Sequence, residues 1–328
     1  MMLEKGKISA RQYTVLVILY TIGTSILIVP SSLATVAKQD GWIASILGIG
    51  AGLLSVLLYH ALGNRFPNMT LAEYSERILG KWLGKTVSLL FISFIFLLAS
   101  FLLRVVGNFM TTHIMPETPI EVVHIVFISV VILAVRLGLE NIGRASEIFL
   151  PWVIILFLLL VGFLSPKIKI DNIQPVLEGG IKPVVLAAFY FFSLQELVVF
   201  LMLFPYVNRT KKARNAFLAG TWIGGIFVII TTVMSTLVLG TDFTVRNMYP
   251  SYTLAKQINV GNFLQRAEAI LAVIWLITIF FKLAVCFYVI ALGLAQTLKL
   301  KDYRPAPFNI MRKSSLLRRR IERKRASF

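Results

Sequence analysis

Cysteine and histidine are nearly absent from this chain, whose 328 residues include one cysteine, Cys286, and three histidines. A single cysteine forms no disulfide within the chain, and no Cys/His cluster has metal-ligand spacing. The sequence also lacks a Gly-rich phosphate loop with its lysine, an HExxH helix and a GxSxG elbow. Because no nucleophile–base pair or metal set can be assembled, we expect neither a cofactor nor an enzyme activity.

Charged residues are scarce as well, at 15% of the chain, whereas hydrophobic residues make up 57%. A soluble protein of this length carries about 25% charged residues. The composition therefore predicts an all-α protein that crosses the bilayer repeatedly, built as one unit rather than as two soluble domains. The net charge of +18 does not indicate nucleic-acid binding, because the basic residues lie in short loops and a terminal tail.

Eight stretches qualify as membrane spans, since a spanning helix needs about 20 largely apolar residues. Between the second and third, Met69–Lys85 is amphipathic, a pattern that suits a helix lying in the membrane interface. The loop Thr241–Glu268 is a candidate for a second such helix on the opposite side. The predicted spans are residues 13–37, 41–63, 86–112, 120–138, 148–165, 184–206, 216–240 and 268–298.

The distribution of lysine and arginine predicts the orientation, because cytoplasmic loops carry an excess of both. With the N-terminus inside, 24 of the 33 basic residues fall on the inner side and seven fall in outer loops. The other two, Arg104 and Lys282, lie within spans. We therefore expect both termini to be cytoplasmic. The sequons at Asn68 and Asn208 fall on the same side, so neither should be glycosylated.

The first span contains residues that interrupt helices, namely Gly23-Thr24-Ser25 followed by Pro30. Broken helices of this kind build midplane sites in secondary transporters, where exposed amides face a carboxylate. A kinked but continuous packing helix is the alternative. In the second span, Gly48 and Gly52 form a small-xxx-small pair, which predicts close helix packing rather than a phosphate loop.

Two opposite charges lie deep in apolar spans. Glu196 lies near the middle of the sixth span, where a carboxylate costs about 2.5–3.5 kcal/mol, and Lys282 lies equally deep in the eighth. The simplest hypothesis is that the two side chains approach each other, directly or through water, and both stay ionised. The pair is either functional or purely structural. Arg104 lies nearer the outer end of its span and is interpreted as a structural residue that snorkels.

Several stretches spread from residue 8 to about 304 carry a resemblance through their order and spacing. They are Ile8-Ser9-Ala10-Arg11-Gln12, the break from Gly23-Thr24-Ser25 to Pro30, Glu73-Tyr74 with Ile78–Lys85, Phe192–Glu196, and Phe204-Pro205-Tyr206 with Lys211-Lys212-Ala213-Arg214. Together they resemble the spore germination permease family, the B subunit of nutrient germinant receptors. That family belongs to the amino acid–polyamine–organocation transporter superfamily.

This resemblance implies a LeuT-like bundle of ten spans in two inverted repeats, here residues 8–165 and 184–298. The first and sixth spans would be discontinuous and face a small-molecule pocket. In this family the subunit is taken to recognise a germinant, commonly an amino acid, in the inner (cytoplasmic) membrane of a spore-forming bacterium, together with an A subunit and a lipoprotein C subunit. Carried onto this chain, the implied ligand-binding residues are Gly23, Thr24 and Ser25 on one side and Tyr190, Ser193 and Glu196 on the other, with Lys282 as the buried charge partner.

The family's ninth and tenth spans are not found after Leu298, which leaves about eight spans and a basic cytoplasmic tail, residues 299–328. Either the copy is truncated, or it is a short form whose tail contacts anionic lipid. Truncation is favoured because Lys301–Pro305 resembles the start of a further span. Three functions stay open: a germinant-sensing subunit, a secondary amino acid transporter with Glu196 as proton carrier, and an inactive copy. Sensing and transport share one pocket chemistry, so the residues do not separate them.

Overall fold

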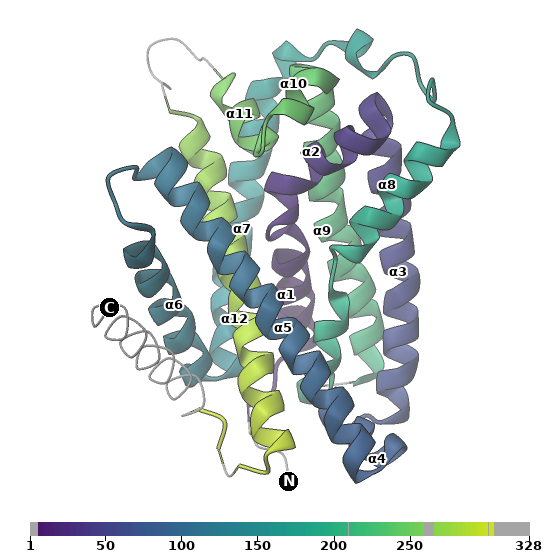
Figure 1. The fold of residues 1–328 in the computed structure, drawn as a ribbon, viewed down its shortest axis with the longest axis vertical. Coiled ribbons are helices and arrows are strands. Elements are labelled where there is room, and N and C mark those ends of the chain that lie inside the picture. The colour runs from purple at the N-terminus through teal and green to yellow at the C-terminus, as the bar shows by residue number, and fades with distance from the viewer. Residues whose placement is uncertain (1–5, 209, 259–265, 301, 305–328) are drawn as a thin grey trace, which may run out of the picture. The chain divides into compact units, whose positions relative to one another are not determined.

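The structure is a computed structural model that describes residues 6–208, 210–258, 266–300 and 302–304, and these residues are almost entirely helical (Figure 1). The chain divides into two compact units. The larger unit comprises Ile8–Pro67 and Gly143–Lys282, and the smaller unit comprises Met1–Lys7, Asn68–Ile142 and Leu283–Phe328. The predicted repeats, residues 8–165 and 184–298, are a different division of the chain and stay a prediction.

Seven helical segments in the described part of the chain are long and apolar enough to cross a membrane. The protein is therefore an all-α polytopic membrane protein. The count differs from the eight predicted spans because residues 25–65 form one long stretch, whereas the helix before them has only 13 residues. The segments are Ser25–Arg65, Lys81–Ile114, Ile120–Leu137, Leu139–Lys167, Ile181–Met202, Lys212–Leu239 and Glu268–Thr297.

In the larger unit the predicted first span is two helices, α1 (Ala10–Ile22) and α2 (Ser25–Ala37), so the predicted break at Gly23 is present. A capping box starts α1, in which the Ser9 hydroxyl accepts the Gln12 N–H and the Gln12 side chain accepts the Ser9 N–H. Because α1 ends at Ile22 and α2 begins at Ser25, the two are separate helices rather than one kinked but continuous helix.

Pro30 lies inside α2 without ending it, so the interpretation of Pro30 as part of the break is wrong. A proline has no N–H, and it leaves the carbonyl four residues earlier without its helical partner. That carbonyl belongs to Ile26, and it accepts a 2.5 Å hydrogen bond from the Ser251 hydroxyl of α11 (Pro250–Lys256). The tertiary contact replaces the missing helical bond, and α2 continues to Ala37.

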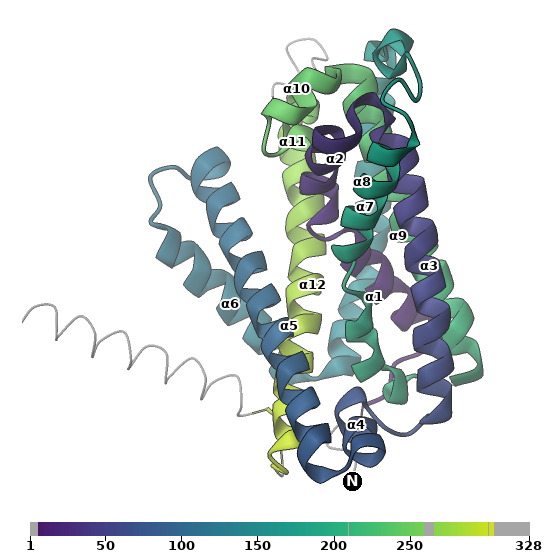
Figure 2. The same cartoon turned by 45° about the vertical axis from the view of Figure 1, so that its right-hand side comes forward.

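Around α1 and α2 pack α3 (Gly41–Arg65), α8 (Ile181–Ser193) and α9 (Thr210–Leu239), as Figures 1 and 2 show from two directions. Glycines allow the close approaches. A Cβ at Gly48 would lie 2.6 Å from the Phe191 ring of α8, which confirms the close packing predicted for this glycine. On α9, a Cβ at Gly220 would lie 2.6 Å from Val17 of α1, an approach that the sequence did not reveal.

The predicted sixth span, residues 184–206, is not one helix. After α8 the chain turns at Leu194–Glu196 and continues as the 3₁₀ segments η5 (Leu197–Met202) and η6 (Phe204–Tyr206). The end of this segment pairs with the residues before α1, because the Ile8 N–H donates to the Tyr206 carbonyl and the Asn208 N–H donates to the Ile8 carbonyl. The start of the first broken element, before α1, and the end of the second, after η6, therefore meet at one backbone junction.

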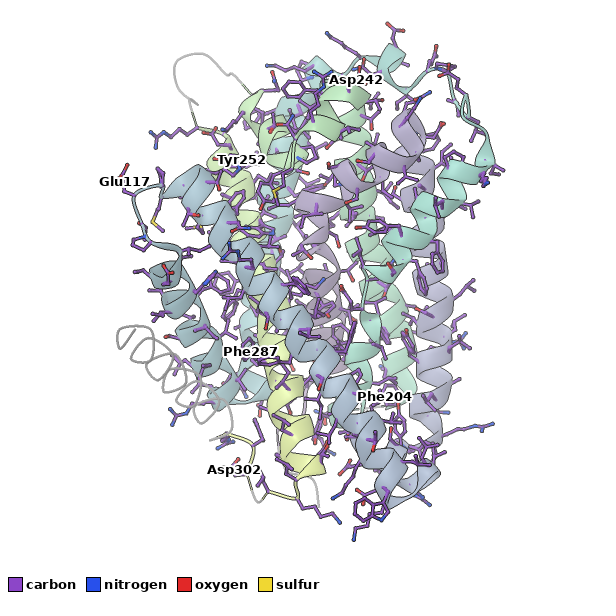
Figure 3. All side chains as sticks on the ribbon, viewed as in Figure 1. Glu117, Phe204, Asp242, Tyr252, Phe287 and Asp302 are labelled. Atoms are coloured by element: carbon purple, nitrogen blue, oxygen red, sulfur yellow. The ribbon has the colours of Figure 1, made fainter. Side chains whose placement is uncertain are left out.

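At the opposite end of the larger unit lie η1 (Lys38–Asp40), η3 (Ser165–Lys167), η4 (Ile170–Ile173), α10 (Thr241–Arg246) and α11. Figure 3 labels Asp242 and Tyr252 at this end and Phe204 of η6 toward the other. The interfacial helix predicted in Thr241–Glu268 is thus two short helices, and residues 259–265 lie outside the described residues. Burial raises the pKa of the Tyr249 and Tyr252 hydroxyls.

The remaining long helices differ from their predicted spans in their ends. The fifth span begins nine residues early as α7 (Leu139–Leu164), and the seventh begins at Thr210 rather than at residue 216. The eighth is α12 (Glu268–Thr297), which contributes residues to both units. Hydropathy marks only the lipid-facing part of a helix, whereas its hydrogen-bond ladder continues through polar turns.

In the smaller unit the predicted interfacial helix is shorter than Met69–Lys85. The helix α4 covers Leu71–Leu79, and Gly80, with φ of +81°, ends it. Trp82 belongs to the next helix, α5 (Lys81–Phe109), which continues into the π-turn Met110–Ile114. This unit is completed by α6 (Ile120–Leu137) and the end of α12. Most of the predicted cytoplasmic tail, residues 299–328, lies outside the described residues.

Candidate functional site

The first helix break leaves the start of α2 without a side-chain cap. The Gly23 N–H closes α1 on the Leu19 carbonyl at 3.0 Å, and Gly23 then leaves helical geometry with φ 13° and ψ −115°. Thr24 is the N-cap residue of α2, but its hydroxyl does not cap the helix. The first amides of a helix have no partner within it and attract negative charge. The break therefore presents a helix N-terminus able to hold a carboxylate.

The second break turns two polar side chains in different directions. The Gln195 amide donates a 2.8 Å hydrogen bond to the Gly48 carbonyl of α3, and its oxygen packs directly against Gly52. Glu196 follows in the left-handed conformation, with φ 41° and ψ 34°. A non-glycine residue there costs on the order of 1–3 kcal/mol, so the surrounding contacts must hold it. Gln195 holds the break against α3, while the Glu196 side chain points toward Lys282.

Lys282 of α12 joins the two breaks. Its Nζ lies 3.0 Å from Glu196 Oε2 and 3.3 Å from Thr24 Oγ1, and it lies 4.9 Å above the Tyr20 ring. The Lys282 side chain is 1% exposed and that of Glu196 9%. We call Tyr20, Gly23, Thr24, Glu196 and Lys282 the break cluster. A single ammonium thus contacts the last turn of α1, the N-cap residue of α2 and the turn after α8.

Gly23 gives the lysine room to reach this position. A Cβ at Gly23 would lie 2.6 Å from Lys282 Cδ and 2.8 Å from the Tyr20 carbonyl oxygen. Neither distance is tolerated by real side chains, so a larger residue would displace the lysine stem or the end of α1. The sequence identified Gly23 as a helix breaker. The structure adds that the missing side chain of Gly23 leaves the space that the Lys282 side chain occupies.

The structure does not bring every predicted site residue into the break cluster. Ser25 is buried in the first turn of α2, directly after Thr24. Tyr190, by contrast, is 47% exposed on α8, and the exposed Ser193 donates a 2.7 Å hydrogen bond to the Tyr190 carbonyl. The roles of all these residues in ligand binding stay predictions. Gln195 was missed, although its place beside Glu196 within an apolar span was a usable signal.

A polar cavity of about 520 Å³ lies at the other end of the larger unit, between η4 and the start of α10. It contains no residue of the break cluster. Gln39 helps to form it, donating through its amide to the Pro175 carbonyl at 2.8 Å and to Glu178 at 3.2 Å. Its charged lining residues are Asp171, Glu178, Asp242 and Arg246. Buried charges at two helix breaks are the stronger sign of function, so we take the break cluster as the candidate site.

Comparison with known proteins supplies a family. Residues 7–311 match the family model described as "Spore germination protein". The chain is 33% identical over 308 residues to spore germination protein KB of Bacillus subtilis (strain 168), covering 92% of this chain and 81% of that protein. It is 29% identical to spore germination protein YndE of the same organism, covering 90% and 82%. Spore germination protein GerLB of Bacillus cereus is 25% identical, covering 83% and 74%.

Proposed function

This chain belongs to the spore germination protein family, and we propose that it is the germinant-sensing subunit of a nutrient germinant receptor. The germinant is a small molecule such as an amino acid, bound at the break cluster. The observation that carries this proposal is the meeting of two helix breaks at one buried pair, Glu196 and Lys282. Intramembrane charges of this kind mark ligand or ion sites in transporter-like proteins.

The chemistry of the break cluster suits a zwitterion. The carboxylate of an amino acid would face the uncapped start of α2 and the Lys282 ammonium, while its amino group would face Glu196. Without ligand, the two protein charges satisfy each other at 3.0 Å. Ligand entry then exchanges one buried ion pair for two, and no buried charge is left unpaired.

The proposal extends to assembly and location. A and C receptor subunits are the proposed partners, and the inner membrane of a spore-forming bacterium is the proposed location, with both termini cytoplasmic. The relatives support this, since they are named spore germination proteins. The apolar helices support a place in the lipid bilayer.

Ligand-dependent stability of the purified protein tests the sensing proposal. A ligand that binds only the folded state stabilises it by about 2.7 kcal/mol at a hundredfold excess over its dissociation constant. We expect one class of amino acid to raise the melting temperature, and Glu196→Gln to abolish the rise. The matched control is Glu117→Gln, which neutralises an exposed carboxylate in the loop before α6 and should keep the rise (Figure 3). A rise that persists in Glu196→Gln would contradict the site.

Transport of an amino acid is the second candidate function, favoured by one observation. A buried carboxylate beside a lysine at a helix break can carry a proton across the site, as in proton-coupled transporters. Net uptake of labelled amino acid into proteoliposomes holding this chain would favour transport. Ligand-dependent stabilisation without uptake, together with loss of spore germination on deletion, would favour sensing.

A further inference from the structure

We infer that the Lys282 ammonium is a built-in cation, which takes the place of a bound sodium ion at the helix break. The inference deepens the proposed function, since it says that the ligand site needs no monovalent metal ion. It rests on the position of the ammonium between the two breaks, on the oxygen atoms around it and on the charge balance of the break cluster.

The surroundings of the Lys282 ammonium are those of a cation site. In transporters with broken helices, the C-terminal ends of half-helices and unwound carbonyls coordinate sodium. Here α1 ends at Ile22, which places the negative end of its dipole at the break. Glu196 Oε2 and Thr24 Oγ1 add two oxygen atoms at 3.0 and 3.3 Å from Nζ. The π face of Tyr20, 4.9 Å away, completes an environment that favours positive charge.

The charge balance argues against a metal ion beside the lysine. Glu196 and Lys282 neutralise each other, and both side chains are at least nine-tenths buried. A further cation would enter without a counter-charge, which is costly in a buried site. The lysine stem also fills the space beside Gly23, where an added Cβ would collide with it. Removing the lysine reverses this balance, because Glu196 then keeps an unpaired negative charge among oxygen atoms.

The melting temperature in different salts, measured without ligand, tests the inference. In sodium, potassium and choline chloride at equal concentration, the unaltered protein should melt at the same temperature. Lys282→Ala should melt at a lower temperature in choline chloride, and sodium chloride should restore part of the loss in a saturable way. The double variant Lys282→Ala/Glu196→Gln should lose this sodium response, because its carboxylate ligand is gone.

Two results would overturn the inference. One is a higher melting temperature of the unaltered protein in sodium than in choline chloride, a result that does not depend on any variant folding. The other is a folded Lys282→Ala protein that responds equally to all three salts. If Lys282→Ala does not fold, Lys282→Gln replaces it, since the glutamine amide can still donate to Thr24 and Glu196. Because no ligand is added, failure here leaves the amino acid assay untouched, and failure of that assay leaves this one untouched.

Discussion

At the scale of single residues, one lysine determines how the candidate site is built. Lys282 contacts Thr24, 258 positions away, and Glu196, 86 positions away. Its ammonium satisfies a carboxylate that would otherwise be buried alone, and its stem requires a glycine at position 23. Gly23 and Lys282 are thus in direct contact in the structure, although nothing in the sequence links the two positions.

Replacing Gly23 by alanine should therefore weaken the folded state. The new Cβ would meet Lys282 Cδ and the Tyr20 carbonyl, and overpacking of this kind costs about 1–3 kcal/mol. Chemical denaturation or thermal melting of the purified variant measures the loss. Gly50→Ala is the matched control, because Gly50 lies inside α3 and a Cβ there meets nothing within 4 Å beyond its chain neighbours and the nearby backbone of its own helix. That control should be neutral or slightly stabilising. Equal losses of stability in both variants would contradict the proposal that Gly23 leaves space for the Lys282 side chain.

At the scale of elements, two helices depend on contacts outside themselves. The proline in α2 is tolerated because Ser251 of α11 donates to the Ile26 carbonyl. The break after α8 is held by Gln195, which reaches α3 through Gly48. In each case a local irregularity in the backbone is matched by a hydrogen bond from a distant segment, as buried polar groups require.

The contact between Ser251 and α2 can be tested by a double-mutant cycle. Ser251→Ala leaves the Ile26 carbonyl unpaired and should cost about 1–3 kcal/mol of stability. Where Pro30→Ala restores the helical N–H, the Ile26 carbonyl gains a partner within α2. The cost of Ser251→Ala should then be smaller in the Pro30→Ala background. Strictly additive effects on the free energy of unfolding would show that the two residues do not share this carbonyl.

At the scale of the whole molecule, the break cluster lies entirely within the larger unit. Its residues come from α1, the break between α1 and α2, the turn after α8 and the first half of α12, and each of them lies within Ile8–Pro67 or Gly143–Lys282. The division into units also crosses both predicted repeats, because α5 and α6 of the first repeat and the end of α12 in the second belong to the smaller unit. Ligand recognition by this cluster is therefore expected to depend on the larger unit. The proposed orientation of the chain also decides from which side of the membrane the separate polar cavity of this unit is reached.

Accessibility of single cysteines checks the orientation. Because the chain has one cysteine, the buried Cys286, a Cys286→Ala background is free of thiols. We expect Glu117→Cys, in the loop between α5 and α6, to react with a membrane-impermeant maleimide from outside intact cells. Arg65→Cys, at the exposed end of α3, should react only after the membrane is opened. The reverse pattern would invert the predicted topology.

The sequence alone determined the membrane class, the approximate positions of most long helices, the family resemblance and the break at Gly23. These follow from hydropathy and backbone propensity, which depend on residues next to one another in the chain. The sequence also singled out Glu196 and Lys282, because a charge within an apolar run is visible locally. It misjudged Pro30 and overextended the interfacial helix, since a distant hydroxyl sustains α2 and the conformation of Gly80 ends α4.

Only the tertiary structure decided which of these residues meet. The contacts of Lys282 with both breaks, the anchoring of Gln195 on α3 and the exposure of Tyr190 and Ser193 on α8 depend on how helices far apart in sequence pack. Propensity and hydropathy carry no information on such pairings, because either face of a helix in an apolar chain can be turned inward. Close packing at glycines and the pairing of buried polar groups select one arrangement, and they act only once the helices are in contact.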